Sequence, residues 1–168
     1  MLRGLNSTLV VFSLAVLCAR ADDGVFQPNE VVQCLRRPET SGMTLLTFNN
    51  PYYLRGDFDG DGKPDYAVSV QAKGGGMGVL VCLGNGGSAL LGSGLGTVRF
   101  SDMPEDKFLA PQWAVYTRQR VAELTSFKVN VPNPVPLVRG ESIAMIWEDG
   151  ICLIYWDGKK FRWAPSRQ

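Results

Sequence analysis

Short runs of alternating apolar and polar residues recur along the chain and predict strands. The clearest is YAVSVQA, residues 66–72, in which Tyr66, Val68 and Val70 fall on one face. An alternation of period two is the pattern of a strand whose two faces meet different surroundings. Further strands are expected over residues 43–48, 79–84 and 127–131, whereas residues 113–117 and 120–125 fit either a strand or a helix.

One stretch departs from period two and predicts a helix. Val31, Cys34 and Leu35 recur at helical spacing within residues 28–37, and Pro38 ends the pattern. The expected fold class is therefore α+β, mainly antiparallel β sheet with one short N-terminal helix and a C-terminal β-meander.

Three apolar runs, ESIAMIWE, ICLIYW and KFRW, make up the expected meander. Glu-Asp-Gly and Asp-Gly-Lys separate them, and Asp-Gly is a common hairpin turn. The aromatic side chains of these runs are expected to cover one sheet face, with a ligand-stacking platform as the alternative: Trp147, Tyr155, Trp156, Phe161 and Trp163.

The first residues have the pattern of a secretory signal peptide. Arg3 precedes an apolar run over residues 9–19, and Ala19-Arg20-Ala21 resembles a cleavage site. The run is shorter than the roughly 20 residues that span a bilayer. We expect a signal peptide over residues 1–21 and a single β-rich calcium-loop domain over residues 22–168, secreted or periplasmic and not inserted in a membrane.

Charge and composition exclude several function classes. The chain has 17 basic and 16 acidic side chains, and two of the basic ones, Arg3 and Arg20, lie in the signal segment. This balance gives no electrostatic reason to expect nucleic acid. There is no histidine, which excludes the usual catalytic triads. The glycine-rich stretches lack the Gly-Lys-Ser/Thr of a phosphate loop.

Three cysteines follow the signal segment: Cys34, Cys82 and Cys152. An oxidising compartment permits one disulfide among them, with three possible pairings. The apolar surroundings of Cys82 and Cys152 favour the alternative, in which all three are buried small hydrophobic side chains.

The stretch GDFDGDGKPD, residues 56–65, concentrates the candidate chemistry. Asp57, Asp59 and Asp61 stand at alternate positions, and Asp65 follows. Two like charges ~4 Å apart repel by about 4 kcal/mol at an effective dielectric of 20, so converging carboxylates need a cation. Oxygen ligands at this spacing suit Ca²⁺ better than Mg²⁺, which demands stricter geometry. An EF-hand is disfavoured because its twelfth position is Val68 rather than glutamate.

Residues 56–70, GDFDGDGKPDYAVSV, resemble the calcium loop of FG-GAP and VCBS-type repeats, the blade motif of integrin-α-like β-propellers. The resemblance implies Ca²⁺ held by the side chains of Asp57, Asp59, Asp61 and Asp65 and by the main-chain carbonyl of Lys63. Propellers repeat this motif, whereas this chain has one copy. The layout is also similar to small exported bacterial proteins that carry one such loop and end in a hairpin like IYWDGKKFRW, which implies fold and location.

Three functions follow as hypotheses. The first is an exported, non-enzymatic calcium-binding interaction or structural module with an unidentified protein partner. The second is a periplasmic inhibitor or immunity-like protein in which the metal is incidental. The third is a metal-dependent hydrolase, for which no second catalytic base is evident in the sequence.

Overall fold

The computed structural model describes residues 27–92, 110, 112–126, 136–148 and 150–164. The expected signal peptide and the strand expected over residues 127–131 lie outside this part of the chain.

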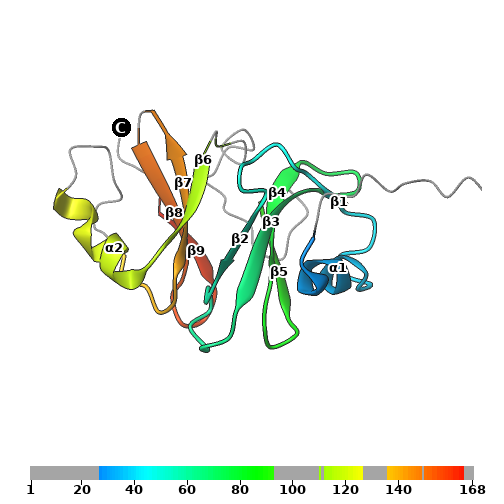
Figure 1. The fold of residues 1–168 in the computed structure, drawn as a ribbon, viewed down its shortest axis with the longest axis horizontal. Helices are drawn as coiled ribbons and strands as arrows, with labels where there is room; N and C mark the ends of the chain where they lie inside the picture. The colour runs from blue at the N-terminus through cyan, green and yellow to red at the C-terminus, as the bar shows by residue number, and fades with distance from the viewer. Residues whose placement is uncertain (1–26, 93–109, 111, 127–135, 149, 165–168) are drawn as a thin grey trace, which may run out of the picture.

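Two antiparallel sheets form most of the described structure (Figure 1). The N-terminal sheet has the strand order β1-β3-β4-β5, and β2 also pairs with β3. The largely antiparallel β architecture expected from the alternation of apolar residues is confirmed. The strands of this sheet are β1 (Thr44–Leu45), β2 (Tyr53–Gly56), β3 (Asp65–Gln71), β4 (Met77–Cys82) and β5 (Ser88–Gly92).

The first strand is much shorter than the expected 43–48, because another strand occupies most of the same edge. β2 pairs with residues 65–68 of β3, and β1 with residues 70–71. After Leu46, whose N–H donates to the Ser69 carbonyl, the chain leaves the edge.

The C-terminal sheet has the order β6-β7-β8-β9, in which each strand pairs antiparallel with the next. The ambiguous residues after Gln112 divide into a strand and a helix at Thr117, whose hydroxyl accepts a hydrogen bond from the Arg120 N–H and so caps the helix. The elements are β6 (Gln112–Tyr116), α2 (Arg118–Ala122), η2 (Glu123–Ser126), β7 (Ser142–Trp147), β8 (Gly150–Trp156) and β9 (Phe161–Ala164).

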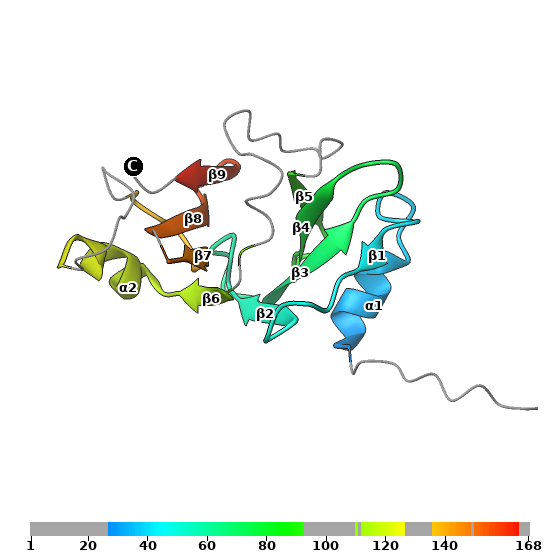
Figure 2. The ribbon, with the colours of Figure 1, turned by 90° about the horizontal axis from the view of Figure 1, so that it is seen from above.

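The two sheets pack face to face, with a helix on each outer side (Figure 2). Helix α1 (Asn29–Leu35) covers the outer face of the N-terminal sheet, and α2 with η2 covers that of the C-terminal sheet. Both faces of β3 are therefore buried. The inter-sheet core contains Leu54, Phe58, Ala67, Val79, Val81, Ala89, Leu91, Ala110, Trp113, Ile143, Met145, Ile154 and Phe161.

The aromatic residues of the last three strands do not all share a face. Phe161 lies in the inter-sheet core, and Trp147, Trp156 and Trp163 pack against it. Tyr155 packs on the opposite face, with α2 and η2. The expectation of one aromatic face is thus wrong for Tyr155, because neighbouring residues of a strand point to opposite faces.

A disulfide joins Cys34 in α1 to Cys82, the last residue of β4. The preferred expectation of three unlinked cysteines is wrong for this pair, because α1 packs on the outer face of the sheet and brings Cys34 beside Cys82. Because the disulfide closes a segment of 48 residues, it stabilises the folded state by about 4 kcal/mol in the chain-entropy estimate. Cys152 is a buried thiol in β8, as expected.

Candidate metal centre

The acidic loop, residues 57–64, connects β2 to β3. Its tight course needs glycine at two positions, since Gly60 and Gly62 have φ of 78° and 85°. Residues with a side chain rarely adopt such angles.

Three carboxylates converge in this loop. Asp57, Asp59 and Asp61 each offer one oxygen, and these oxygens lie within 4.8 Å of one another. The convergence that the alternate spacing predicts is therefore found. Asp57 and Asp59 are half-buried, and Asp61 is exposed.

Backbone N–H groups of the loop hold these side chains in place. Asp57 accepts hydrogen bonds from Gly60 at 2.8 Å and from Gly62 at 3.1 Å. Asp59 accepts one from the Asp61 N–H at 3.1 Å, and Asp61 accepts one from the Lys63 N–H at 2.8 Å. The side chains are thus oriented by the loop itself, which reduces the entropy that binding a cation would cost.

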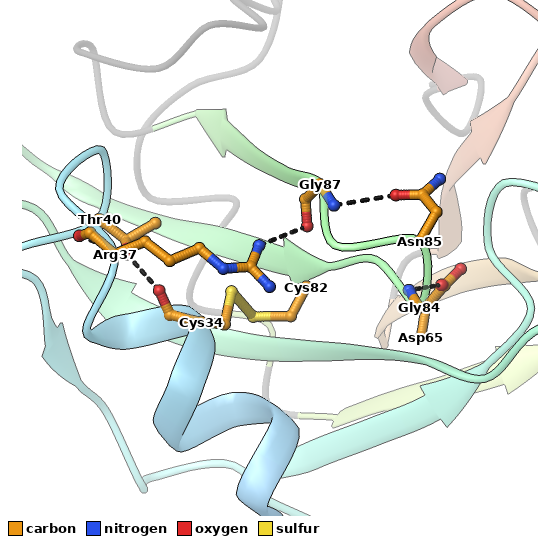
Figure 3. The surroundings of a disulfide bond; sticks show 8 residues. All are labelled: Cys34, Arg37, Thr40, Asp65, Cys82, Gly84, Asn85 and Gly87. Atoms are coloured by element: carbon orange, nitrogen blue, oxygen red, sulfur yellow. Dashed lines mark hydrogen bonds between the residues drawn. A yellow bond between two sulfur atoms is a disulfide. The ribbon is translucent and has the colours of Figure 1, made fainter.

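Asp65 has a different environment from the other three aspartates. It is fully buried, with 0% of its surface exposed. One carboxylate oxygen accepts from the N–H groups of Phe58 (2.7 Å) and Asp59 (3.3 Å). The other accepts from the Gly84 N–H at 2.8 Å (Figure 3). Asp65 therefore fastens the start of the loop to the β4–β5 turn.

Burial raises the pKa of two of the four aspartates. Burial raises the pKa of Asp65, although the N–H groups of Gly84 and Phe58 act in the opposite direction. Burial also raises the pKa of Asp59; the Asp61 N–H opposes that rise, and the charges of Asp61 and Asp57 add to it. Among the described residues, no basic side chain forms an ion pair with any of the four aspartates. A cation is the partner that would favour their charged forms.

Lys63 contacts the aspartates through its backbone, and within the described structure its side chain forms no ion pair with them. Its N–H donates to Asp61. The expected roles of the Lys63 carbonyl and the Asp65 carboxylate as metal ligands stay predictions.

Phe58 anchors the acidic loop in the protein. It stands between two of the converging aspartates, yet its side chain is 1% exposed and lies in the inter-sheet core. The loop is therefore fixed to the core by an aromatic side chain while its carboxylates face outward.

The segment that precedes β7 in the C-terminal sheet contacts the acidic loop. The Glu141 carboxylate accepts from the Asp57 N–H at 2.9 Å, and the Glu141 N–H donates to the Asp57 carbonyl at 2.7 Å. Gly140 permits this approach, because a Cβ there would lie 2.3 Å from the Asp57 carbonyl oxygen. An open depression beside this contact is lined by Asp57, Thr117, Arg118, Gln119, Gly140 and Glu141.

Asn85 makes a further contact with the aspartates that the sequence did not predict. Its side-chain amide donates to Asp59 at 3.1 Å, and its carbonyl oxygen accepts from the Gly87 N–H at 2.9 Å. The sequence NGGS identified a turn, but no signal placed that turn beside the aspartates. The sequence predicted a strand from Glu141 but no contact of Glu141 or Gly140 with the aspartates.

No protein-family model, curated protein or solved structure matches the chain. Within the described ranges, no helix has the length and apolar character that crossing a membrane would require. The geometry of the acidic loop is therefore the main indication of function in this protein.

Proposed function

We propose that the protein is an exported, non-enzymatic calcium-binding module in which Ca²⁺ orders the acidic loop between β2 and β3. The observation that carries this proposal is the convergence of Asp57, Asp59 and Asp61 within 4.8 Å, without a basic side chain in an ion pair with them in the described structure. The side chain of Asp65 and the carbonyl of Lys63 complete the proposed ligand set.

The donor set favours calcium over transition metals and magnesium. All the proposed ligands are hard oxygen atoms, which suit Ca²⁺ and Mg²⁺. An oxygen cage supplied mainly by protein groups favours Ca²⁺, because Mg²⁺ dehydrates reluctantly and requires near-ideal octahedral geometry.

The position of the loop supports a structural role for the ion. The loop contacts the C-terminal sheet through Glu141 and Gly140, and its Phe58 side chain fills the inter-sheet core. An ion that fixes the loop therefore stabilises the contact between the two sheets. The function we propose is a calcium-stabilised scaffold for an interaction with another protein.

Export is part of the proposal. The apolar N-terminal run and the Ala19-Arg20-Ala21 sequence support it. The Cys34–Cys82 disulfide is a second support, since disulfides persist mainly in oxidising compartments.

Thermal unfolding tests the proposal. At free Ca²⁺ of 100 times the dissociation constant, binding to the folded state alone adds about 2.7 kcal/mol. For a domain of this size we expect the midpoint to rise by about 5–10 °C over that in chelator.

The matched variants are Asp59→Asn, which should lose the calcium-dependent rise, and Asp157→Asn, which should keep it. Asp157 also accepts backbone hydrogen bonds in an Asp-Gly turn, but it lies outside the acidic loop. An equal midpoint with calcium and with chelator in the wild type would refute the proposal. Calcium-dependent hydrolysis that Asp61→Asn abolishes would refute the non-enzymatic part.

A further inference from the structure

The turn between β4 and β5, residues 83–87, packs against the acidic loop. Its Gly84 N–H donates to Asp65, and its Asn85 amide donates to Asp59. The two backbones are pressed together, because a Cβ on Gly84 would lie 2.8 Å from the Pro64 carbonyl oxygen. The positions of Asp59, in the loop, and Asp65, at the start of β3, therefore depend on where this turn lies.

The same turn is held from its other side by α1 and the residues that follow it (Figure 3). The Cys34–Cys82 disulfide fixes the residue immediately before the turn. The Arg37 guanidinium donates to the Gly87 carbonyl at 2.9 Å, at the far end of the turn. The Thr40 hydroxyl donates to the carbonyl of Cys34, so the chain after α1 folds back onto the disulfide-bonded residue. A continuous path of contacts thus runs from the disulfide through the turn to Asp65 and Asp59.

We propose that the disulfide positions the acidic loop, so that the affinity of the loop for Ca²⁺ depends on the redox state of Cys34 and Cys82. This inference rests on the proposed calcium site. Reduction by a dithiol transfers two electrons and two protons to the disulfide, breaks the S–S bond and yields two thiols, while the dithiol becomes a disulfide. Arg37 and apolar packing then remain to hold α1 against the turn.

Linkage makes the effect reciprocal. If reduction weakens Ca²⁺ binding by a given factor, bound Ca²⁺ makes the disulfide harder to reduce by the same factor. We expect a factor of about ten, which corresponds to a reduction potential lower by about 30 mV in saturating calcium.

The test compares Ca²⁺ titrations of the purified protein in its oxidised and dithiol-reduced forms, with circular dichroism showing that both are folded. We expect the dissociation constant to rise about tenfold on reduction. A double variant, Cys34→Ala with Cys82→Ala, should bind weakly with and without reductant. Cys152→Ala should keep the wild-type redox dependence, because this thiol lies outside the disulfide. Equal dissociation constants for the folded oxidised and reduced wild type would overturn the inference.

Hydrogen exchange separates a failure of this inference from a failure of the proposed function. The amides of Phe58 and Gly84 both donate to Asp65, and their exchange can be followed without any metal. Reduction should accelerate exchange at both amides more than at amides in β8. If no form binds Ca²⁺ but this acceleration is seen, the calcium site is refuted and the positioning role stands. Unchanged exchange at both amides would overturn the positioning role whether or not Ca²⁺ binds.

Discussion

Aspartates of one short motif have two different environments in this protein. Asp57, Asp59 and Asp61 bring oxygens together at the surface of the loop. Asp65 is buried and accepts hydrogen bonds from three backbone N–H groups. Loss of such a buried acceptor is costly, because each backbone N–H left without a partner is also shielded from water. The fourth aspartate therefore holds the loop together before any ion is considered.

We expect Asp65→Asn to destabilise the calcium-free protein by about 2–3 kcal/mol, because the new NH₂ group must face a backbone N–H donor. Urea unfolding in chelator measures this change. Asp61→Asn is the matched control; since Asp61 is exposed, its cost should stay below about 1 kcal/mol. Equal costs for the two variants would contradict the structural role of Asp65.

The raised pKa values of Asp59 and Asp65 give a pH dependence. In calcium-free buffer, the contribution of a raised folded-state pKa to stability is greatest below the ordinary value of 3.8, and it is lost as the pH rises through the folded-state pKa. Bound Ca²⁺ favours the charged carboxylates instead. The calcium-induced rise in melting temperature should therefore be large at about pH 7 and much smaller at about pH 4.5. A rise of the same size at both pH values would contradict carboxylate ligation.

At the scale of elements, the acidic loop is held between two segments distant in sequence. The β4–β5 turn contacts it from the N-terminal sheet, and the residues before β7 contact it from the C-terminal sheet. Gly140 does not have a positive φ, so only space requires glycine there: the Asp57 carbonyl occupies the place of a side chain.

Gly140→Ala should consequently separate the segment before β7 from the loop. We expect a loss of about 2–3 kcal/mol in unfolding free energy, comparable to overpacking in a core. Gly86→Ala is the control, because Gly86 has φ of 93° but open space around its Cβ position, so its cost is the backbone term of about 1–2 kcal/mol. A Gly140→Ala protein as stable as the wild type would show that this contact does not form.

The sequence predicted those parts of the fold and site that depend on local pattern. The alternation after Pro64 identified β3, and the alternate spacing of the aspartates identified their convergence. Contacts between distant segments left no such pattern. Asn85 reaches Asp59 across 26 residues and Glu141 reaches Asp57 across 84 residues, and neither follows from periodicity. The Cys34–Cys82 pairing was missed for the same reason.

At the scale of the molecule, the acidic loop lies where the two sheets meet. Phe58 ties it to the inter-sheet core, and Glu141 ties it to the C-terminal sheet. A cation in the loop would thus act on the packing of the whole protein rather than on one hairpin. This arrangement supports our proposal that the ion stabilises the fold rather than takes part in catalysis.

Phe58→Ala should destabilise the protein by about 3–5 kcal/mol, because it removes a buried aromatic side chain and leaves a cavity between the sheets. Phe48→Ala is a matched control, since Phe48 is 51% exposed, and it should cost about 1 kcal/mol or less. Chemical denaturation of both variants measures the difference. Similar costs would contradict the anchoring of the loop in the core.

Isothermal titration calorimetry with Ca²⁺ tests the central claim most directly. We expect one Ca²⁺ per chain in the wild type and in Asp157→Asn, and no binding in a variant that carries both Asp59→Asn and Asp61→Asn. The absence of Ca²⁺ binding by the folded wild type, or undiminished binding by the double variant, would contradict the assignment of the acidic loop as a calcium site.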